Sequence, residues 1–217
     1  MFVETKDTAG EVRILQPLPE RTGGGSQAFE LRLARLLRVL GAEVATGADY
    51  AGAARWEVHK ALTGRSELPE EYFEPLLEAA VHDPNPSFNR RFVEPALIAF
   101  GQRRVRLALL DYLRTGTNPE RAGAARAWYW TALTVRGGRH ATADEGATVR
   151  DSWNRAALRE FVGNEDLDVR RCILPGLPLV PRAYPADLHT LVEAAVTIAR
   201  SHPDEYIRHR AEVQTAL

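Results

Sequence analysis

The sequence predicts an all-α fold, a short and irregular α-α superhelix of about five helical hairpins. Apolar residues recur at helical spacing from residue 26 onward. Short segments rich in glycine, proline and asparagine separate these runs, and none of the runs alternates in the way of a half-buried strand. Because short links force successive helices to lie antiparallel, this order of helix and turn indicates hairpins.

The first 25 residues differ from the remainder and are expected to form an N-terminal extension and a glycine-rich linker, with residues 26–217 as the helical domain. Apolar residues on both sides of Asp7–Gly10 suggest a short β-hairpin, because that segment is rich in turn formers. Gly23–Gly25 follow as a flexible link. They lack the GxxxxGK[ST] pattern of a phosphate-binding loop.

The helical spacing predicts ten helices. In the first, Ser26 is the candidate N-cap and Gly41 the C-cap, with an apolar stripe between them. Pro75, Pro95 and Pro175 lie inside apolar runs, where kinks are expected. A longer polar loop is expected at 135–143. The predicted helices span residues 26–40, 49–63, 69–82, 87–100, 103–114, 119–133, 144–162, 166–177, 185–201 and 204–217.

A weak internal repeat runs through the helical region. Ala51–Arg55 and Ala122–Arg126 share the sequence Ala-Gly-Ala-Ala-Arg, and such small residues indicate helices that approach one another closely. A period of tens of residues is typical of stacked repeats. Four segments with a similar opening place one residue each in register, namely Arg91, Ala124, Arg170 and Arg208.

Two of these segments, Asn164–Arg171 and His202–Arg208, resemble the turn and second-helix start of HEAT repeats, where an acidic turn residue precedes a Val-Arg pair and an apolar face. The chain departs from that pattern at Ala124, where the repeats have arginine. The resemblance extends over residues 26–217. It implies an armadillo-like helical superhelix that presents an extended surface to a partner protein.

Composition excludes several classes of function. The 28 basic and 29 acidic residues leave a formal net charge of -1, so no overall charge attracts nucleic acid or an anionic bilayer. Lys6 and Lys60 are the only lysines, which is typical of a GC-rich bacterial genome. Cys172 is the only cysteine, which excludes an internal disulfide and CxxC zinc sites. A cytoplasmic protein without membrane partner is therefore expected, since no signal-peptide or membrane-spanning pattern occurs.

The expected function is that of a non-enzymatic protein-binding or scaffold module whose second helices form the contact face. Arginines in register could instead pair with acidic turn residues and fix how the repeats stack. Burial of the contact face between layers would contradict the first interpretation. The residues predicted for the contact face are Arg55, His59, Arg91, Glu94, Arg126, Trp130, Arg170 and Arg208. The stacking interpretation pairs Arg91, Arg170 and Arg208 with Asp83, Asp166, Asp168 and Asp204.

The alternative function is a nucleic-acid-binding or DNA-repair protein. Trp128–Trp130, Trp153 and Asp151 resemble the aromatic and acidic residues of HEAT-like alkylpurine DNA glycosylases, although such aromatics also fill cores. HEAT-like repeats also occur in bilin lyases, but no tetrapyrrole site is indicated. The six histidines form no HExxH motif, and Cys172 lies in an apolar run. No metal, cofactor or catalytic residue is therefore predicted.

Overall fold

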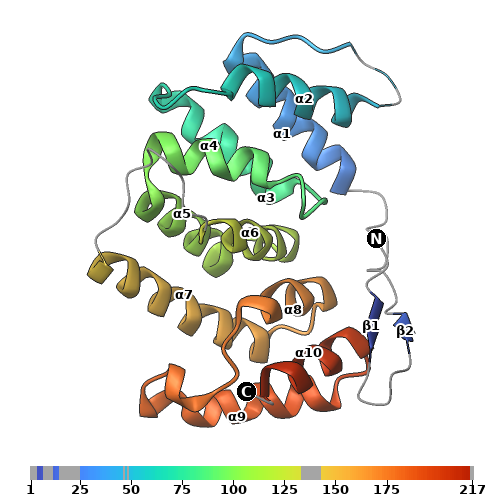
Figure 1. Ribbon diagram of the computed structural model, residues 1–217, viewed down its shortest axis with the longest axis vertical. Coiled ribbons are helices and arrows are strands. Elements are labelled where there is room, and N and C mark those ends of the chain that lie inside the picture. The colour runs from blue at the N-terminus through green and yellow to red at the C-terminus, as the bar shows by residue number, and fades with distance from the viewer. Residues whose placement is uncertain are drawn as a thin grey trace.

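The computed structural model describes residues 4–6, 12–14, 25–45, 47, 49–132 and 143–215. Helices dominate the described residues, which confirms the all-α prediction (Figure 1). The α-helices are α1 (Gly25–Leu40), α2 (Tyr50–Leu62), α3 (Phe73–His82), α4 (Arg90–Phe100), α5 (Gln102–Thr115), α6 (Asn118–Trp130), α7 (Ala143–Gly163), α8 (Leu167–Ile173), α9 (His189–Ser201) and α10 (Glu205–Thr215). Single 3-10 turns lie at Glu70–Tyr72, Leu174–Gly176, Pro181–Ala183 and Ala186–Leu188.

A two-stranded hairpin precedes the helices. Strand β1 (Glu4–Lys6) pairs antiparallel with β2 (Val12–Ile14), and Thr5 lies opposite Arg13. This pairing agrees with the hairpin that the sequence suggested. Its turn and most of the glycine link lie outside the described residues. The same holds for the polar loop expected at 135–143 except for Ala143, which begins α7.

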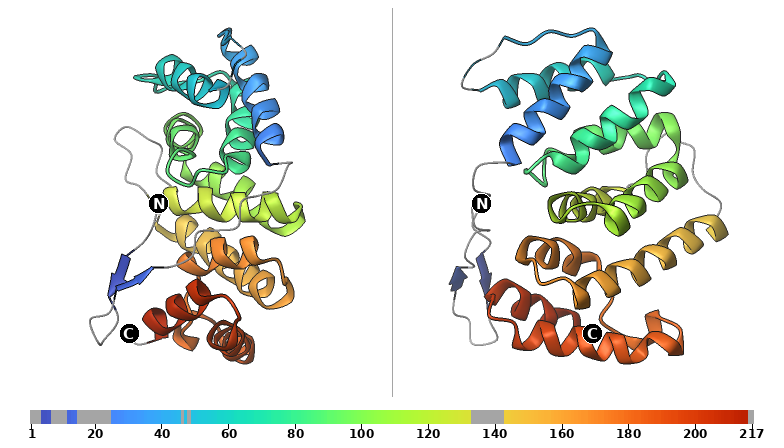
Figure 2. Two further views of the ribbon diagram at one scale, coloured as in Figure 1. Left: turned by 90° about the vertical axis from the view of Figure 1, so that its right-hand side faces the viewer. Right: turned by 180° about the vertical axis from the view of Figure 1, so that it is seen from behind.

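The helices pack as five consecutive pairs that follow one another along the long axis of the molecule (Figures 1 and 2). Within the pairs, α1 packs on α2, α3 on α4, α5 on α6, α7 on α8 and α9 on α10. Between pairs, first helices contact first helices at α1–α3, α5–α7 and α7–α9. Each second helix contacts the second helix of the next pair, at α2–α4, α4–α6, α6–α8 and α8–α10. The packing of the second pair on the third departs from this pattern, because the first helix α3 packs closely on the second helix α6.

Local sequence signals account for where the helices end. Gly41 and Gly64 have positive φ angles of 66° and 79°, a conformation that glycine adopts without steric cost, and each ends a helix as predicted. Pro95 lies inside α4 as expected. The other two prolines do not lie in a helix interior. Pro75 lies in the first turn of α3, where a backbone N–H would have no intrahelical acceptor, and Pro175 lies in the 3-10 turn after α8.

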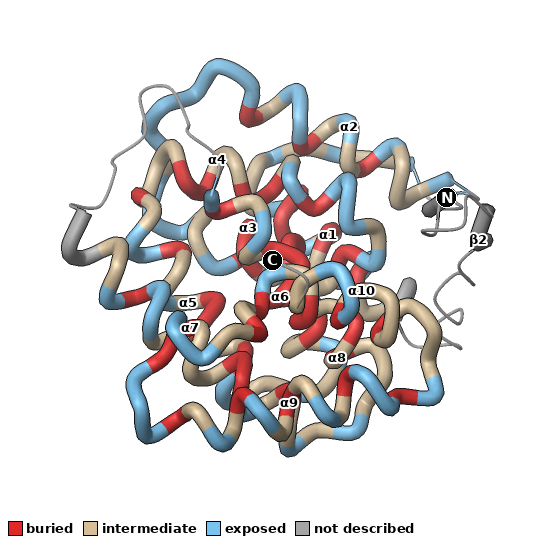
Figure 3. The backbone as a smooth tube through the Cα atoms, turned by 60° about the horizontal axis from the view of Figure 1, so that its bottom comes forward, coloured by how far each residue is buried: buried red, intermediate tan, exposed pale blue. Residues whose placement is uncertain are grey.

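The core is continuous along the stack, and buried residues occur in every layer of helices (Figure 3). Phe29, Phe92 and Phe161 are its largest fully buried side chains. Gly123 allows the close packing of α6 on α3: a Cβ atom at Gly123 would stand only 1.8 Å from the carbonyl oxygen of Val81. The small residues of the Ala-Gly-Ala-Ala-Arg segment thus act as predicted at α6.

Acidic turn residues do link neighbouring layers, but through other arginines than the stacking interpretation named. The Nε and Nη2 atoms of Arg55 donate to both carboxylate oxygens of Asp83 at 2.9 and 2.7 Å. The same two atoms of Arg171 bind both oxygens of Asp204. The pairing predicted for Arg91, Arg170 and Arg208 is therefore wrong, because Arg55 of α2 and Arg171 of α8 bind these carboxylates instead.

Arg170 and Arg208 instead hold the backbone of their own helical pair. Arg170 Nε donates to the carbonyl oxygen of Phe161 at 3.2 Å, and Arg208 Nη1 donates to the carbonyls of His202 and Pro203 at 2.6 and 2.8 Å. These carbonyls lie at the ends of α7 and α9, where helical partners are missing. Both arginines consequently have a structural role in closing helix ends.

Candidate functional site

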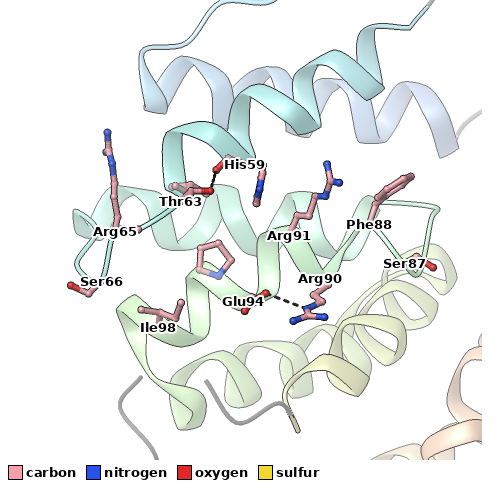
Figure 4. A pocket seen from close by; sticks show the side chains of 13 residues that line it. His59, Thr63, Arg65, Ser66, Ser87, Phe88, Arg90, Arg91, Glu94 and Ile98 are labelled. Atoms are coloured by element: carbon pink, nitrogen blue, oxygen red, sulfur yellow. Dashed lines mark hydrogen bonds and ion pairs between the residues drawn. The ribbon is translucent and has the colours of Figure 1, made fainter. Parts of the chain in front are cut away.

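A groove with a volume of about 570 Å³ lies between α2 and α4. His59 comes from α2, and Thr63, Arg65 and Ser66 come from the segment after it (Figure 4). The opposite wall comes from α4 and from Ser87 and Phe88 just before it. The groove forms because the two helices meet over only a short stretch, while their first-helix partners α1 and α3 pack extensively.

Positive charge dominates the groove. Arg65, Arg90 and Arg91 line it together with His59, and Glu94 is the only carboxylate among its lining residues. Arg90 Nε lies 3.2 Å from the Glu94 carboxylate, which therefore neutralises one guanidinium (Figure 4). Arg65 and Arg91 have no acidic partner among the described residues. The groove thus retains two positive charges that are open to solvent.

Exposed aromatic side chains stand at the edge of this groove. Phe88 lines it and is 39% exposed, and the Arg91 guanidinium lies 5.0 Å from the Phe88 ring centroid. Trp56, 52% exposed, lies one turn before His59 on α2, with its ring centroid 5.7 Å from the imidazole. Aromatic and arginine side chains are enriched at the energetically dominant positions of protein interfaces.

A second, smaller cavity of about 310 Å³ lies between α6, α8 and the segment before α4. Trp128, Tyr129, Trp130 and Trp153 all line it, together with Tyr206 of α10. The Trp128 and Trp153 rings stack with centroids 4.0 Å apart and an interplanar angle of 4°. All four aromatic residues that the sequence singled out therefore meet in one place.

Each of the neighbouring aromatics in α6 has a different environment, as expected for successive residues of a helix. Tyr129 is 65% exposed. Trp130 is half-buried, and its indole N–H donates to the Pro86 carbonyl at 3.0 Å and to Asn89 Oδ1 at 2.7 Å. The Trp130 indole thereby fixes the segment before α4, which separates the cavity from the groove.

Arg126 is one of two buried arginines that line this cavity, the other being Arg171, and only 9% of its surface is exposed. Its Nη1 lies 3.6 Å from Asp168 and donates to the Cys172 sulfur at 3.3 Å. Its Nε and Nη2 have no hydrogen-bond partner among the described residues. Placing Arg126 on an open contact face was therefore wrong, because the close packing of α6 on α8 encloses it.

The eight residues predicted for one contact face divide between several places. His59, Arg91 and Glu94 line the groove, whereas Trp130 lines the cavity with Arg126. The remaining three have structural roles. Arg170 and Arg208 bind helix ends, and Arg55 binds Asp83 while its guanidinium lies 4.6 Å from the ring centroid of Phe29.

The structure also separates residues that the glycosylase resemblance had grouped. Asp151 lines a shallow depression near Tyr184, apart from the aromatic cavity. Cys172 lines the cavity, but burial raises the pKa of its thiol to about 11, which keeps it protonated at neutral pH. Among the residues that the structure describes, no group of histidine, cysteine and carboxylate side chains is arranged to hold a metal ion.

Sequence reasoning missed Arg65 in the groove and Tyr206 in the cavity. Arg65 directly follows the helix-ending Gly64, a place that gives no signal of binding. Tyr206 reaches the cavity from α10, which is distant in sequence, so that only the packing of α10 on α8 brings it there.

Comparisons with known proteins give no family for this chain. No family model matches the sequence, and the searches of curated proteins and of solved structures found no match either. The resemblance to HEAT repeats therefore stays a prediction. In the part of the chain that the structure describes, no helix is long and apolar enough to cross a membrane.

Proposed function

We propose that this chain is a non-enzymatic protein-binding module whose contact surface is the α2–α4 groove, and that the groove binds an acidic, extended segment of a partner protein. The observation that supports this proposal is the excess of positive charge in the groove. Arg65 and Arg91 have no acidic partner in the part of the chain that the structure describes, while the one carboxylate of the lining, Glu94, is already paired with Arg90. A partner with acidic side chains would supply the missing charge.

The dimensions of the groove favour a short peptide segment. Helix α4 contains 11 residues, which at 1.5 Å per residue gives a length of about 16 Å. An extended chain of about five residues spans that distance at roughly 3.3 Å per residue. Phe88 and Trp56 at the edge offer apolar contacts beside the charges, so that a mixed acidic and apolar segment fits best.

Direct titration tests the proposal. A fluorescein-labelled peptide of about eight residues that alternates glutamate with leucine would span the groove, and fluorescence anisotropy would report its binding. We expect Arg91→Glu and Arg65→Glu each to weaken binding about tenfold, because a reversed charge repels the peptide. Arg114→Glu is the matched control, since Arg114 is exposed on α5 and does not line the groove. Equal losses in all three variants would contradict a specific groove.

The same titration separates a protein partner from a nucleic acid. Duplex DNA bound more tightly than the peptide, with an affinity that falls steeply between 50 and 200 mM salt as phosphate contacts require, would replace the proposal by the nucleic-acid hypothesis. Affinity capture from the native cells then identifies the partner. The Arg65→Glu, Arg91→Glu double variant serves as bait for comparison, and a protein that both baits retain equally does not use the groove.

A further inference from the structure

The cavity between α6 and α8 contains an arginine whose charge-binding edge is vacant. Three arginines can be compared within this one molecule. Arg55 and Arg171 each use the Nε–Nη2 edge of the guanidinium to bind both oxygens of a carboxylate. Arg126 occupies the same place in its Ala-Gly-Ala-Ala-Arg segment as Arg55 does, yet its Nε and Nη2 have no partner among the described residues.

Burial makes the vacant edge significant. A buried donor without a hydrogen bond costs free energy, and the cost is larger for a charged group, so that such donors are rare in native proteins. Arg126 is nine-tenths buried and lines the cavity. Its one acidic neighbour, Asp168, is 3.6 Å from the opposite Nη1 atom and does not line the cavity. No carboxylate of the described residues therefore reaches the Nε–Nη2 edge.

The cavity lining defines what else a ligand must have. Aromatic and aliphatic side chains form most of the walls, with Trp128 and Trp153 as a flat stacked pair and Ile173 and Pro175 beside them. Arg126 and Arg171 are the charged residues of the lining, and both are positive. A volume of about 310 Å³ is near the lower end for small-molecule sites, and it accommodates one aromatic ring with a short side chain.

We propose that this cavity binds a small monocarboxylate with a flat, apolar body. The carboxylate pairs with the guanidinium of Arg126, whose Nε and Nη2 are enclosed and have no partner among the described residues, so the side chain turns toward the cavity to meet it. The apolar body packs against the aromatic walls. Cys172 stays a protonated thiol beside Arg126 and takes no part in covalent chemistry. Only Ser87 lines both this cavity and the α2–α4 groove, and the proposal does not depend on the function proposed for the groove.

Phenylacetate is a suitable probe, with phenylacetamide as its uncharged counterpart of the same shape. Tryptophan fluorescence reports binding, because Trp128 and Trp153 line the cavity. We expect saturable quenching by phenylacetate with a midpoint below ~1 mM. Phenylacetamide should bind at least about tenfold more weakly, since it cannot pair with the guanidinium charge. The chemical shift of the Arg126 Nε–H, followed by nitrogen-15 NMR, should move with phenylacetate only.

Variants locate the site. Arg126→Gln should weaken phenylacetate binding at least about tenfold, whereas the matched control Arg114→Gln, on the exposed surface of α5, should leave it unchanged. Circular dichroism and thermal melting check that Arg126→Gln folds. If it does not, Gly176→Leu replaces it: Gly176 lines the cavity, and a Cβ atom there meets no atom within 4 Å, so the added side chain starts in open space and should obstruct the cavity.

Three outcomes would overturn the proposal. The first is the absence of saturable quenching by phenylacetate, and the second is equal affinity for the acid and the amide. The third is a loss of binding in Arg114→Gln as large as that in Arg126→Gln or Gly176→Leu. A failure of the acidic peptide to bind the groove would leave this site untouched, because the two titrations use different ligands and different residues.

Discussion

Replacing Gly123 by alanine should destabilise the protein, although alanine is the better helix former. The added Cβ would lie 1.8 Å from the Val81 carbonyl oxygen, and real Cβ atoms essentially never approach another atom to within 3.0 Å. Helices α6 and α3 would therefore have to separate by at least ~1.2 Å, which loosens the contacts of six consecutive buried residues of α6.

Overpacking of this kind costs typically 1–3 kcal/mol, and here the obstructing atom belongs to the backbone, which cannot rotate away. The helix propensity of alanine returns up to about 1 kcal/mol. We expect a net loss of about 2 kcal/mol, which for a chain of this size lowers Tm by roughly 4–8 °C. Thermal unfolding followed by circular dichroism measures this shift.

Two other glycines serve as controls. Gly146 lies in α7 with nothing within 4 Å of a Cβ position, so Gly146→Ala should raise stability by roughly 0.5–1 kcal/mol. Gly52 is the counterpart of Gly123 in the shared Ala-Gly-Ala-Ala-Arg segment, but a Cβ there meets only the Asp49 side chain, which can move. Gly52→Ala should therefore change Tm little. A Gly123→Ala variant that melts at or above the temperature of these two variants would refute the close packing of α6 on α3.

Two further predictions concern the last two helical pairs. Burial alone would raise the pKa of Asp204, but hydrogen bonds from Arg171 and from the Ile207 N–H outweigh it and the pKa is lowered. The ionised Asp204 thus stabilises the folded state above the unfolded-state pKa of about 3.9, and this stabilisation is lost as the pH falls through the folded-state pKa. Urea denaturation of Asp204→Asn should therefore show a lower midpoint at pH 7 and a weaker loss of stability in acid. Parallel plots of midpoint against pH for the wild type and the variant would contradict the pairing. Asp166 caps α8 by accepting from the Val169 N–H at 2.9 Å, so Asp166→Ala should cost about 1 kcal/mol in the same assay, and an unchanged midpoint would exclude the cap.

Much of the fold could be predicted because its signals are local. All ten predicted helices are present, and most of their ends agree within a few residues, since apolar spacing and positive-φ glycines act within a few residues of chain. Helix α8 is the main exception among the ends. The apolar run extends to Leu177, but Pro175 stops the α-helix at Ile173, because proline offers no N–H to continue it.

The candidate site could be predicted only in part. The sequence drew attention to His59, Arg91 and Glu94, which line the groove, and to the tryptophans, which line the cavity. It placed Arg126 on the same open face as those residues. Helical periodicity indicates which side of a helix a residue occupies, but it does not indicate what the next layer places there.

The sequence by itself determined the helices, their order and their pairing into hairpins, because these depend on neighbours along the chain. Only the tertiary structure decided what two identical Ala-Gly-Ala-Ala-Arg segments do. At α2 the arginine, Arg55, binds Asp83, and a Cβ at Gly52 would meet only the movable Asp49 side chain. At α6 a Cβ at Gly123 would meet the backbone of α3, and Arg126 lines a cavity. The physical reason is that burial and charge pairing depend on atoms contributed by helices distant in sequence, which no local pattern specifies.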